Sequence, residues 1–142
     1  MRETITILSK VALIAMLFFG FFQRAFADDN PMFVTITAKE SCSACKKFEP
    51  TLEKLKDEYD GRITFITLDV SSKDSLEESK QAAEDNGIEK FFEENKGLVP
   101  RVGILCPGGA KTENVFLGEM RKEVYEEVLD KLLTDTSTVC SL

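Results

Sequence analysis

The sequence predicts an α/β fold in which a four-stranded mixed sheet is flanked by helices, in the order strand, helix, strand, helical segment, strand, strand, helix. In the first half, strand patterns alternate with a helix pattern, which indicates a parallel unit with a helical crossover. In the second half, two strand patterns flank a Pro-Gly-Gly turn, which predicts an antiparallel hairpin. The last apolar residues recur at helical spacing, so a helix should cover this hairpin.

The composition fits a single compact domain, because the chain has 142 residues, of which 43% are hydrophobic and 30% are charged. The formal net charge is -7, so the positive charge that binds nucleic-acid phosphates is missing and we expect no nucleic acid as a partner. The count of histidine is 0, which excludes imidazole as a metal ligand or a general base. Any chemistry must use cysteine, carboxylate, lysine or backbone groups.

Residues 1–27 are typical of a secretory signal peptide. Two basic residues, Arg2 and Lys10, precede an apolar run from Val11 to Phe22. Ala25-Phe26-Ala27 then supplies small residues for cleavage. The run is shorter than the roughly 20 residues that span a bilayer, but an uncleaved N-terminal anchor is the alternative. Either way we expect an extracytoplasmic protein, periplasmic or secreted.

The folded domain is expected at residues 28–134. Its first strand is predicted at Phe33–Ala38, where β-branched and aromatic residues precede a polar turn. Apolar residues recur every three or four positions from Ser43 to Tyr59 and predict a helix, in which Pro50 removes one backbone hydrogen bond and should kink the axis. Arg62–Val70 has apolar residues on both faces, as a buried parallel strand does.

The polar segment Ser71–Lys96 should form helices near residues 74–85 and 88–95, separated by Asn86-Gly87. A solvated insertion and a surface that selects a partner are both compatible with this segment.

The hairpin should consist of strands at Leu98–Cys106 and Thr112–Leu117, the first of which Pro100 interrupts early. Met120–Leu133 predicts the final helix, and residues 135–142 are expected to form a C-terminal tail.

Cys42-Ser43-Ala44-Cys45 lies where the first strand pattern ends and the first helix pattern begins. Free backbone N–H groups and the helix dipole at such a position stabilise a thiolate. We therefore expect Cys42 to be the exposed nucleophile. Cys45, one turn into the helix, should be the more buried sulfur that resolves a mixed disulfide.

A Cys-x-x-Cys pair alone is compatible with half of a zinc site, a structural bridge or a redox pair. Zinc would need two further ligands from Cys106, Cys140 or carboxylates, and a bridge across so short a loop contributes little stability. We therefore favour the redox pair and expect no metal and no cofactor. Thiolate metal carriage is kept as an alternative.

Several residues occur in an order that resembles the thioredoxin superfamily over residues 33–133. They are the Cys-Ser-Ala-Cys motif after a strand, Pro50 five positions after the second cysteine, Val99-Pro100 before a strand, and Gly118 between the last strand and the last helix. The resemblance implies a thioredoxin-like fold. It also implies a thiol–disulfide oxidoreductase in which Cys42 and Cys45 are the catalytic, redox-active pair.

The resemblance further implies that the Val99-Pro100 bond is cis and that these two residues bind an extended substrate segment through backbone groups. We expect protein substrates with thiols or disulfides, a separate redox partner that is membrane-bound or soluble, and a monomer. The Ser43-Ala44 dipeptide does not indicate the direction of electron flow. A thioredoxin-like module that binds a partner without redox activity is the alternative.

The sequence departs from the superfamily pattern at two positions. Many thioredoxins carry a buried acidic residue six positions before the first cysteine, where this chain has Ile36, and a tryptophan just before it, where this chain has Ser41. These differences argue against a fast, general reductase. For Cys106 and Cys140, a bridge that holds the tail and two free thiols are both compatible with the sequence.

Overall fold

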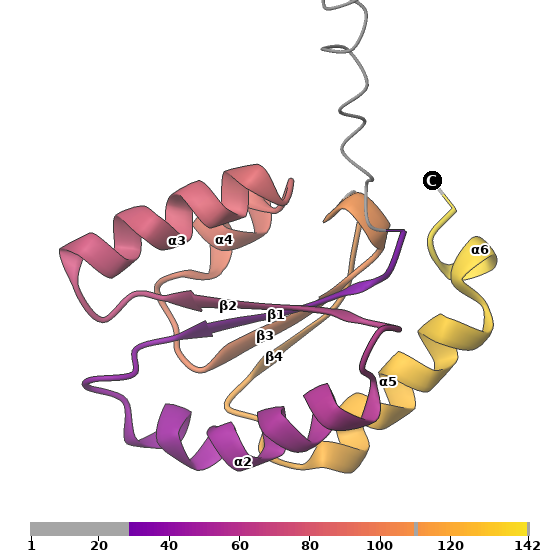
Figure 1. The fold of residues 1–142 in the computed structure, drawn as a ribbon, viewed down its shortest axis with the longest axis horizontal. Helices are drawn as coiled ribbons and strands as arrows, with labels where there is room; N and C mark the ends of the chain where they lie inside the picture. Colours follow the sequence, from indigo (N-terminus) through magenta and orange to yellow (C-terminus); the bar gives the residue numbers. More distant parts are fainter. Residues whose placement is uncertain (1–28, 110, 142) are drawn as a thin grey trace, which may run out of the picture.

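A mixed sheet of four strands forms the centre of the fold, in the order β2-β1-β3-β4 (Figure 1). β1 (Met32–Thr37) pairs in parallel with β2 (Thr64–Asp69) and in antiparallel orientation with β3 (Arg101–Leu105). β4 (Thr112–Leu117) pairs antiparallel with β3 at the sheet edge. The arrangement confirms the predicted α/β class and its mixed sheet.

The structure is a computed structural model that describes residues 29–109 and 111–141. Residues 1–27, where the sequence predicts a signal peptide or anchor, lie outside the described residues. Within the described part of the chain, none of the helices has the length and apolar character needed to cross a bilayer.

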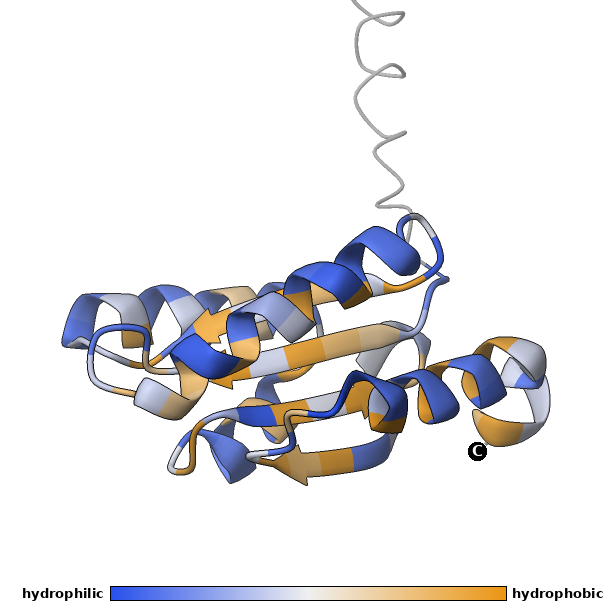
Figure 2. Cartoon of the chain, turned by 90° about the horizontal axis from the view of Figure 1, so that it is seen from below, coloured by the Kyte–Doolittle hydropathy of each residue, from blue (hydrophilic) through white to orange (hydrophobic). Residues whose placement is uncertain are grey.

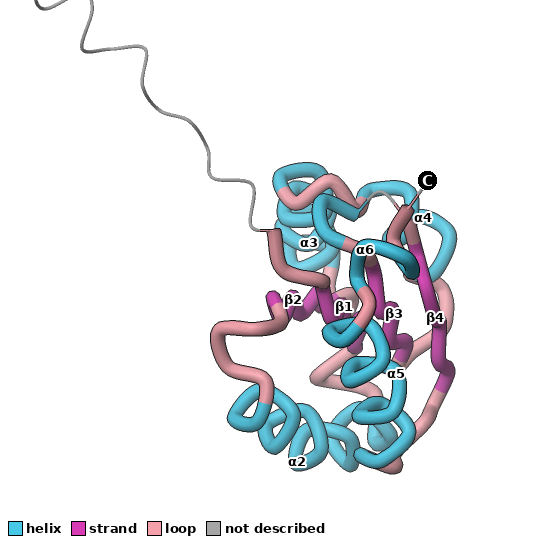
Figure 3. The backbone as a smooth tube through the Cα atoms, turned by 90° about the vertical axis from the view of Figure 1, so that its right-hand side faces the viewer, coloured by secondary structure: helices cyan, strands magenta, loops and turns pink. Residues whose placement is uncertain are grey.

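Helices cover both faces of the sheet (Figures 1 and 3). α2 (Ser43–Glu58) and α5 (Lys122–Thr134) pack on one face, and α3 (Lys73–Asp85) and α4 (Glu89–Asn95) pack on the other. The strands carry mainly hydrophobic residues and the helices mainly hydrophilic ones, because only one side of each helix contacts the sheet (Figure 2).

β1 contributes to two cores because successive side chains of a strand point to opposite faces. Phe33 packs with Phe48 and Tyr125 in the core beneath α2 and α5. Val34 and Ile36 lie in the other core, beneath α3 and α4. This alternation decides which residues of β1 face the helix that carries the two cysteines.

Segment 71–96 is more than a solvated insertion. Ala83, Ile88, Phe91 and Phe92 are all buried and form most of the helical side of the second core. Burying such apolar side chains is the main favourable contribution to folding. The polar residues of the segment therefore lie on the outside of helices that the sheet requires as a cover.

Two predicted boundaries differ from the structure for local reasons. The strand expected at Leu98–Cys106 begins at Arg101, because the residues before it form the turn around Pro100, which has no N–H to donate. The last helix begins at Lys122. The N–H groups of Met120 and Arg121 donate to the Glu119 carboxylate, each at 2.9 Å, and so hold these two residues outside the helix.

The segment expected to be a tail contains a short helix, α6 (Thr136–Val139). A disulfide joins Cys140, just after α6, to Cys106 at the end of β3, with a Cα–Cα distance of 5.6 Å. Lys111 also donates a hydrogen bond to the Val139 carbonyl at 2.6 Å. The end of the described chain is thus fixed to the sheet.

Candidate active site

The Cys-Ser-Ala-Cys motif lies at the carboxyl end of β1, where a short loop enters α2 (Figure 1). The N–H groups of Ser41 and Cys42 donate to the Ala38 carbonyl at 3.1 and 2.9 Å and close this loop. Cys42 is the N-cap of α2, and its Sγ accepts the N–H of Cys45 at 3.0 Å. The sulfur of Cys42 therefore occupies the position of a helix-capping acceptor, which suits a negative charge.

The two sulfurs differ in their access to solvent. Cys42 is partly exposed, whereas Cys45 is only 4% exposed. They are joined as a disulfide with a Cα–Cα distance of 5.2 Å, so the described state is the oxidised one. An incoming thiolate can approach Cys42 more readily than Cys45, which favours a mixed disulfide on Cys42.

Val99 and Pro100 lie at the same end of the sheet. Arg101, the first residue of β3, pairs with Ile36 near the end of β1, so the two preceding residues lie beside the loop that leads to Cys42. The Val99-Pro100 bond is cis, as expected, and the Pro100 carbonyl accepts the N–H of Gly118 at 3.0 Å. The structure thus brings the cysteine pair and the cis-proline turn together.

Apolar side chains are exposed at this end. Leu98 is 53% exposed and directly precedes the cis-proline turn. Leu117 is 52% exposed and pairs with Arg101 across the hairpin. Two large apolar side chains are thus exposed at the end of the sheet that carries the cysteine pair.

The Cys106–Cys140 disulfide lies at the opposite end. Leu105, which precedes Cys106, pairs with Met32 at the beginning of β1, whereas the loop to Cys42 leaves from the end of β1. The structure does not bring Cys106 and Cys140 to the redox pair, so a direct relay of electrons between the two disulfides is not supported.

A comparison with family models gives a match to the thioredoxin model over residues 17–91, which is more than half of the chain. The chain belongs to the thioredoxin family. Comparison with curated protein sequences finds no match.

Solved structures with the same fold include three thioredoxins. Thioredoxin O2 from Arabidopsis thaliana, in its oxidised state, has 17% identity and a TM-score of 0.51, covering 74% of this chain and 76% of that one. The germline-specific thioredoxin Deadhead from Drosophila melanogaster has 21% identity and a TM-score of 0.51, with 75% and 84% covered. Oxidised thioredoxin from Plasmodium falciparum has 20% identity and a TM-score of 0.51, with 75% and 85% covered. At these identities the likeness concerns the fold.

In this thioredoxin-family chain, the residue six positions before Cys42 does not face the cysteine pair. Ile36 is fully buried in the core beneath α3 and α4, on the face of the sheet away from the cysteines. The residues of β1 that line the pocket beside Cys45 are Thr35 and Thr37. Neither was predicted from the sequence, although the alternation of buried faces from Phe33 onward indicates that Thr35 and Thr37 point to the same side as Phe33.

Asp69 is a partly buried acidic residue near the loop that leads to Cys42. Asp69 ends β2 and pairs in register with Thr37. Burial alone would raise the pKa of Asp69, but hydrogen bonds from the hydroxyl and N–H of Ser71 and from the Lys39 backbone hold its pKa below the ordinary value. The Asp69 side chain is therefore favoured as the carboxylate, and its hydrogen bond with the Lys39 backbone joins the loop after β1 to the end of β2.

Proposed function

We propose that this thioredoxin-family protein is an extracytoplasmic thiol–disulfide oxidoreductase that reduces, forms or exchanges disulfides in protein substrates. The single observation that carries the proposal is the asymmetry of the cysteine pair. Cys42 is a partly exposed N-cap whose Sγ accepts a backbone N–H, and Cys45 is 4% exposed one turn further on. Disulfide exchange requires one accessible thiolate and one shielded resolving thiol.

In the reducing direction, the Cys42 thiolate attacks one sulfur of a substrate disulfide and the other substrate sulfur leaves as a thiolate. Cys45 then loses its proton and attacks Cys42 Sγ, which releases the second substrate thiolate and forms the Cys42–Cys45 disulfide. Two electrons pass from the cysteine pair to the substrate. The reverse sequence forms a disulfide in the substrate, and the potential of the redox partner sets the direction.

Substrate binding is assigned to the surface around the cis-proline turn. Val99 is only partly buried, so its backbone N–H and C=O can pair with an extended segment, as in strand addition. The exposed Leu98 and Leu117 would contact apolar side chains of that segment. Backbone pairing with two apolar contacts favours many protein substrates over one small molecule.

Two observations support the extracytoplasmic location. Residues 1–27 have the pattern of a signal peptide or anchor. A second disulfide, Cys106–Cys140, joins residues distant in sequence, and such structural bridges persist in oxidising compartments.

The proposal is tested by reduction of insulin with dithiothreitol as the electron source. Cys42→Ser should abolish the protein-dependent rate, and Cys45→Ser should accumulate a mixed disulfide with insulin. Ser43→Ala, a change at an exposed position between the two cysteines, is the matched control and should retain the rate. A Cys42→Ser protein with the full rate refutes the proposal.

The reduction potential of the Cys42–Cys45 pair assigns the direction. A value near about -270 mV indicates a reductant, and one near about -120 mV indicates an oxidant.

The exposed Leu98 and Leu117 also favour a second candidate, a partner-binding module without turnover. In that case, the unmodified protein does not reduce insulin. Replacement of both Cys42 and Cys45 by serine then leaves the affinity for an extended apolar peptide unchanged.

A further inference from the structure

The pocket beside Cys45 contains a buried hydroxyl group without a partner. Thr35 is 2% exposed, and its Oγ1 has no hydrogen-bond partner among the described residues, 29–109 and 111–141. Buried side-chain hydroxyl groups are nearly always satisfied by protein or by water. The pocket has a volume of about 70 Å³, which accommodates more than one water molecule. Thr35 is therefore placed to hold water next to Cys45.

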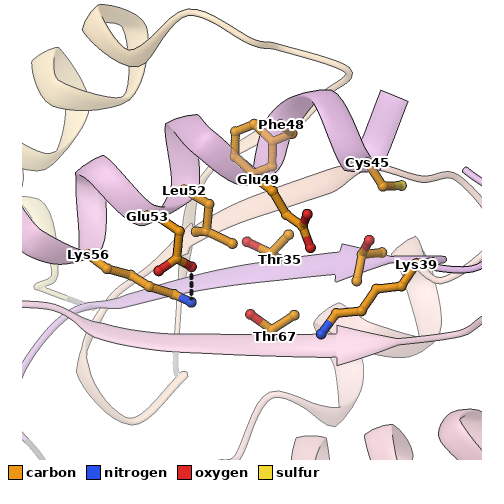
Figure 4. A pocket seen from close by; sticks show the side chains of 10 residues that line it. Thr35, Lys39, Cys45, Phe48, Glu49, Leu52, Glu53, Lys56 and Thr67 are labelled. Atoms are coloured by element: carbon orange, nitrogen blue, oxygen red, sulfur yellow. Dashed lines mark hydrogen bonds and ion pairs between the residues drawn. The ribbon is translucent and has the colours of Figure 1, made fainter. Parts of the chain in front are cut away.

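Charged groups reach this pocket from α2 and from the loop after β1 (Figure 4). Glu49, from α2, extends its carboxylate beside Thr35 on the side toward Cys45, and Lys39, from the loop after β1, extends over β2 toward Thr67. Glu53 and Lys56, further along α2, form an ion pair with each other at 2.9 Å.

Glu49 is the better placed of the two carboxylates that α2 contributes to this pocket. It follows Cys45 by one helical turn, whereas Glu53 follows it by two and is already paired with Lys56. Among the described residues, Glu49 forms no ion pair. Asp69, at the end of β2, is engaged by Ser71 and the Lys39 backbone.

The buried position of Cys45 creates a need for proton transfer. To attack the mixed disulfide, its thiol must become a thiolate, and burial disfavours the charged form. β1 supplies only hydroxyl groups to the pocket, because Ile36 points to the other face of the sheet. A hydroxyl group can hold water in place but is too weak a base to accept the proton.

We propose that water held by Thr35 in this pocket carries the Cys45 proton to the Glu49 carboxylate during the resolving step. The inference rests on the proposed function, because it concerns the second half of the exchange reaction. Cys45 gives its proton to the water, which passes a proton to Glu49. The Cys45 sulfur then bonds to Cys42 Sγ, the bond between Cys42 and the substrate breaks, and the electron pair leaves on the substrate sulfur. Thr35 is a positioning residue, and Glu49 is the proton acceptor.

The two halves of the reaction can be separated with 5,5′-dithiobis(2-nitrobenzoate). The protein is used with Cys42 and Cys45 reduced and Cys106–Cys140 intact, which a thiol count verifies. In stopped flow, the first release of thionitrobenzoate reports attack by Cys42, and the second reports attack by Cys45. Thr35→Val and Glu49→Gln should each slow the second release by about tenfold or more, since positioned acid–base groups typically contribute at least this much. The first release should keep its rate.

Two controls separate proton transfer from a structural effect. Glu53→Gln removes a carboxylate from the same pocket and the same helix, and should leave both releases unchanged. Thr35→Ser retains the hydroxyl and should retain the second rate, which keeps the test valid even if Thr35→Val folds poorly. Added formate should accelerate the second release of Glu49→Gln, because a small carboxylate can accept the proton in its place.

The outcomes distinguish this inference from the proposed function. Absence of the first release in the unmodified protein contradicts the oxidoreductase itself. A normal first release with an unchanged second release in Thr35→Val and Glu49→Gln overturns the proton route alone. Equal slowing by Glu53→Gln, or no effect of formate, also overturns it, because the change would then reflect the charge of the pocket and not a proton acceptor.

Discussion

The hydroxyl of Tyr59 donates a hydrogen bond to the carboxylate of Asp130 at 2.7 Å, which joins the end of α2 to α5. Tyr59 is 1% exposed, and its ring lies in the core beneath these two helices. Burial and the neighbouring Asp130 carboxylate raise the pKa of Tyr59 above its ordinary value. The helix that positions the cysteines is thus fastened at its far end by a polar contact.

Replacement of Tyr59 by phenylalanine should lower the free energy of unfolding by about 1 kcal/mol, the usual value for one hydrogen bond. Equilibrium unfolding in urea at pH 7 measures the loss. Asp130→Asn, which keeps an acceptor for the hydroxyl, is the control and should lose less.

The same tyrosine should make the free energy of unfolding depend on pH in the alkaline range. Its pKa is raised on folding, so its protonated form is favoured in the native state. The resulting stabilisation is fully present below pH about 10 and is lost as pH rises above it. Urea unfolding at pH 8 and 10.5 should show a smaller decrease in stability for Tyr59→Phe than for the unmodified protein. Equal decreases in the two proteins contradict the assignment.

The Cys106–Cys140 disulfide should stabilise the fold substantially, because it closes a loop with a sequence separation of 34. Loop-closure entropy for this length corresponds to about 3–4 kcal/mol. We expect Cys106→Ala with Cys140→Ala to lower the free energy of unfolding by this order. Removal of the Cys42–Cys45 bridge, with a separation of 3, should cost clearly less. Urea unfolding of both double variants measures the difference, and equal losses argue against the loop-length account.

Gly103, in the middle of β3, is required by the close approach of α4. A Cβ atom at this position would lie 2.4 Å from the Phe91 ring, and Phe91 is only 4% exposed, so the ring has little room to move. Gly103→Ala should therefore lower the free energy of unfolding by about 1–3 kcal/mol, the usual cost of overpacking. Gly97→Ala is the matched control, because nothing lies within 4 Å of its added Cβ. Thermal unfolding compares the two.

The Glu119 carboxylate should make the stability of the fold depend on pH in the acid range. Hydrogen bonds from the side chain and backbone of Arg121 and from the Met120 N–H lower the pKa of Glu119 to about 2. Because the folded pKa lies below the unfolded one, the stabilisation is present above pH about 4.3 and is lost as pH falls toward 2. Between pH 5 and 2.5, the melting temperature of Glu119→Gln should fall less than that of the unmodified protein. Parallel falls contradict this prediction.

The fold could be predicted from the sequence because the spacing of apolar residues indicates which side of each strand or helix is buried. The alternation at Phe33–Ala38 and the helical spacing before Tyr59 located β1 and α2 within one residue at each end. The face of each residue was harder to assign. A count of six positions from Cys42 selected Ile36, whereas the pleat of the strand directs Thr35 toward Cys45.

The remaining parts of the site depend on contacts between residues distant in sequence. Whether Cys106 and Cys140 pair is decided by where α6 lies, which no local pattern states. No local pattern distinguishes Glu49 from the other charged residues of α2, and only the assembled sheet brings it into one pocket with Thr35. Local rules therefore predicted the elements and the cysteine pair, and the pocket required the assembled fold.

The two disulfides lie near opposite ends of β3. The cis-proline turn precedes Arg101 at the Cys42–Cys45 end, and Cys106 follows Leu105 at the other end. The start of β1 and α6 both lie at the Cys106 end of the sheet (Figure 1), and Asn30 precedes β1 while Ser141 follows Cys140. A fusion partner, label or surface tether attached at either position would leave Cys42 facing outward. The protein can thus be immobilised or tagged at both ends of its described chain without obstructing the redox pair.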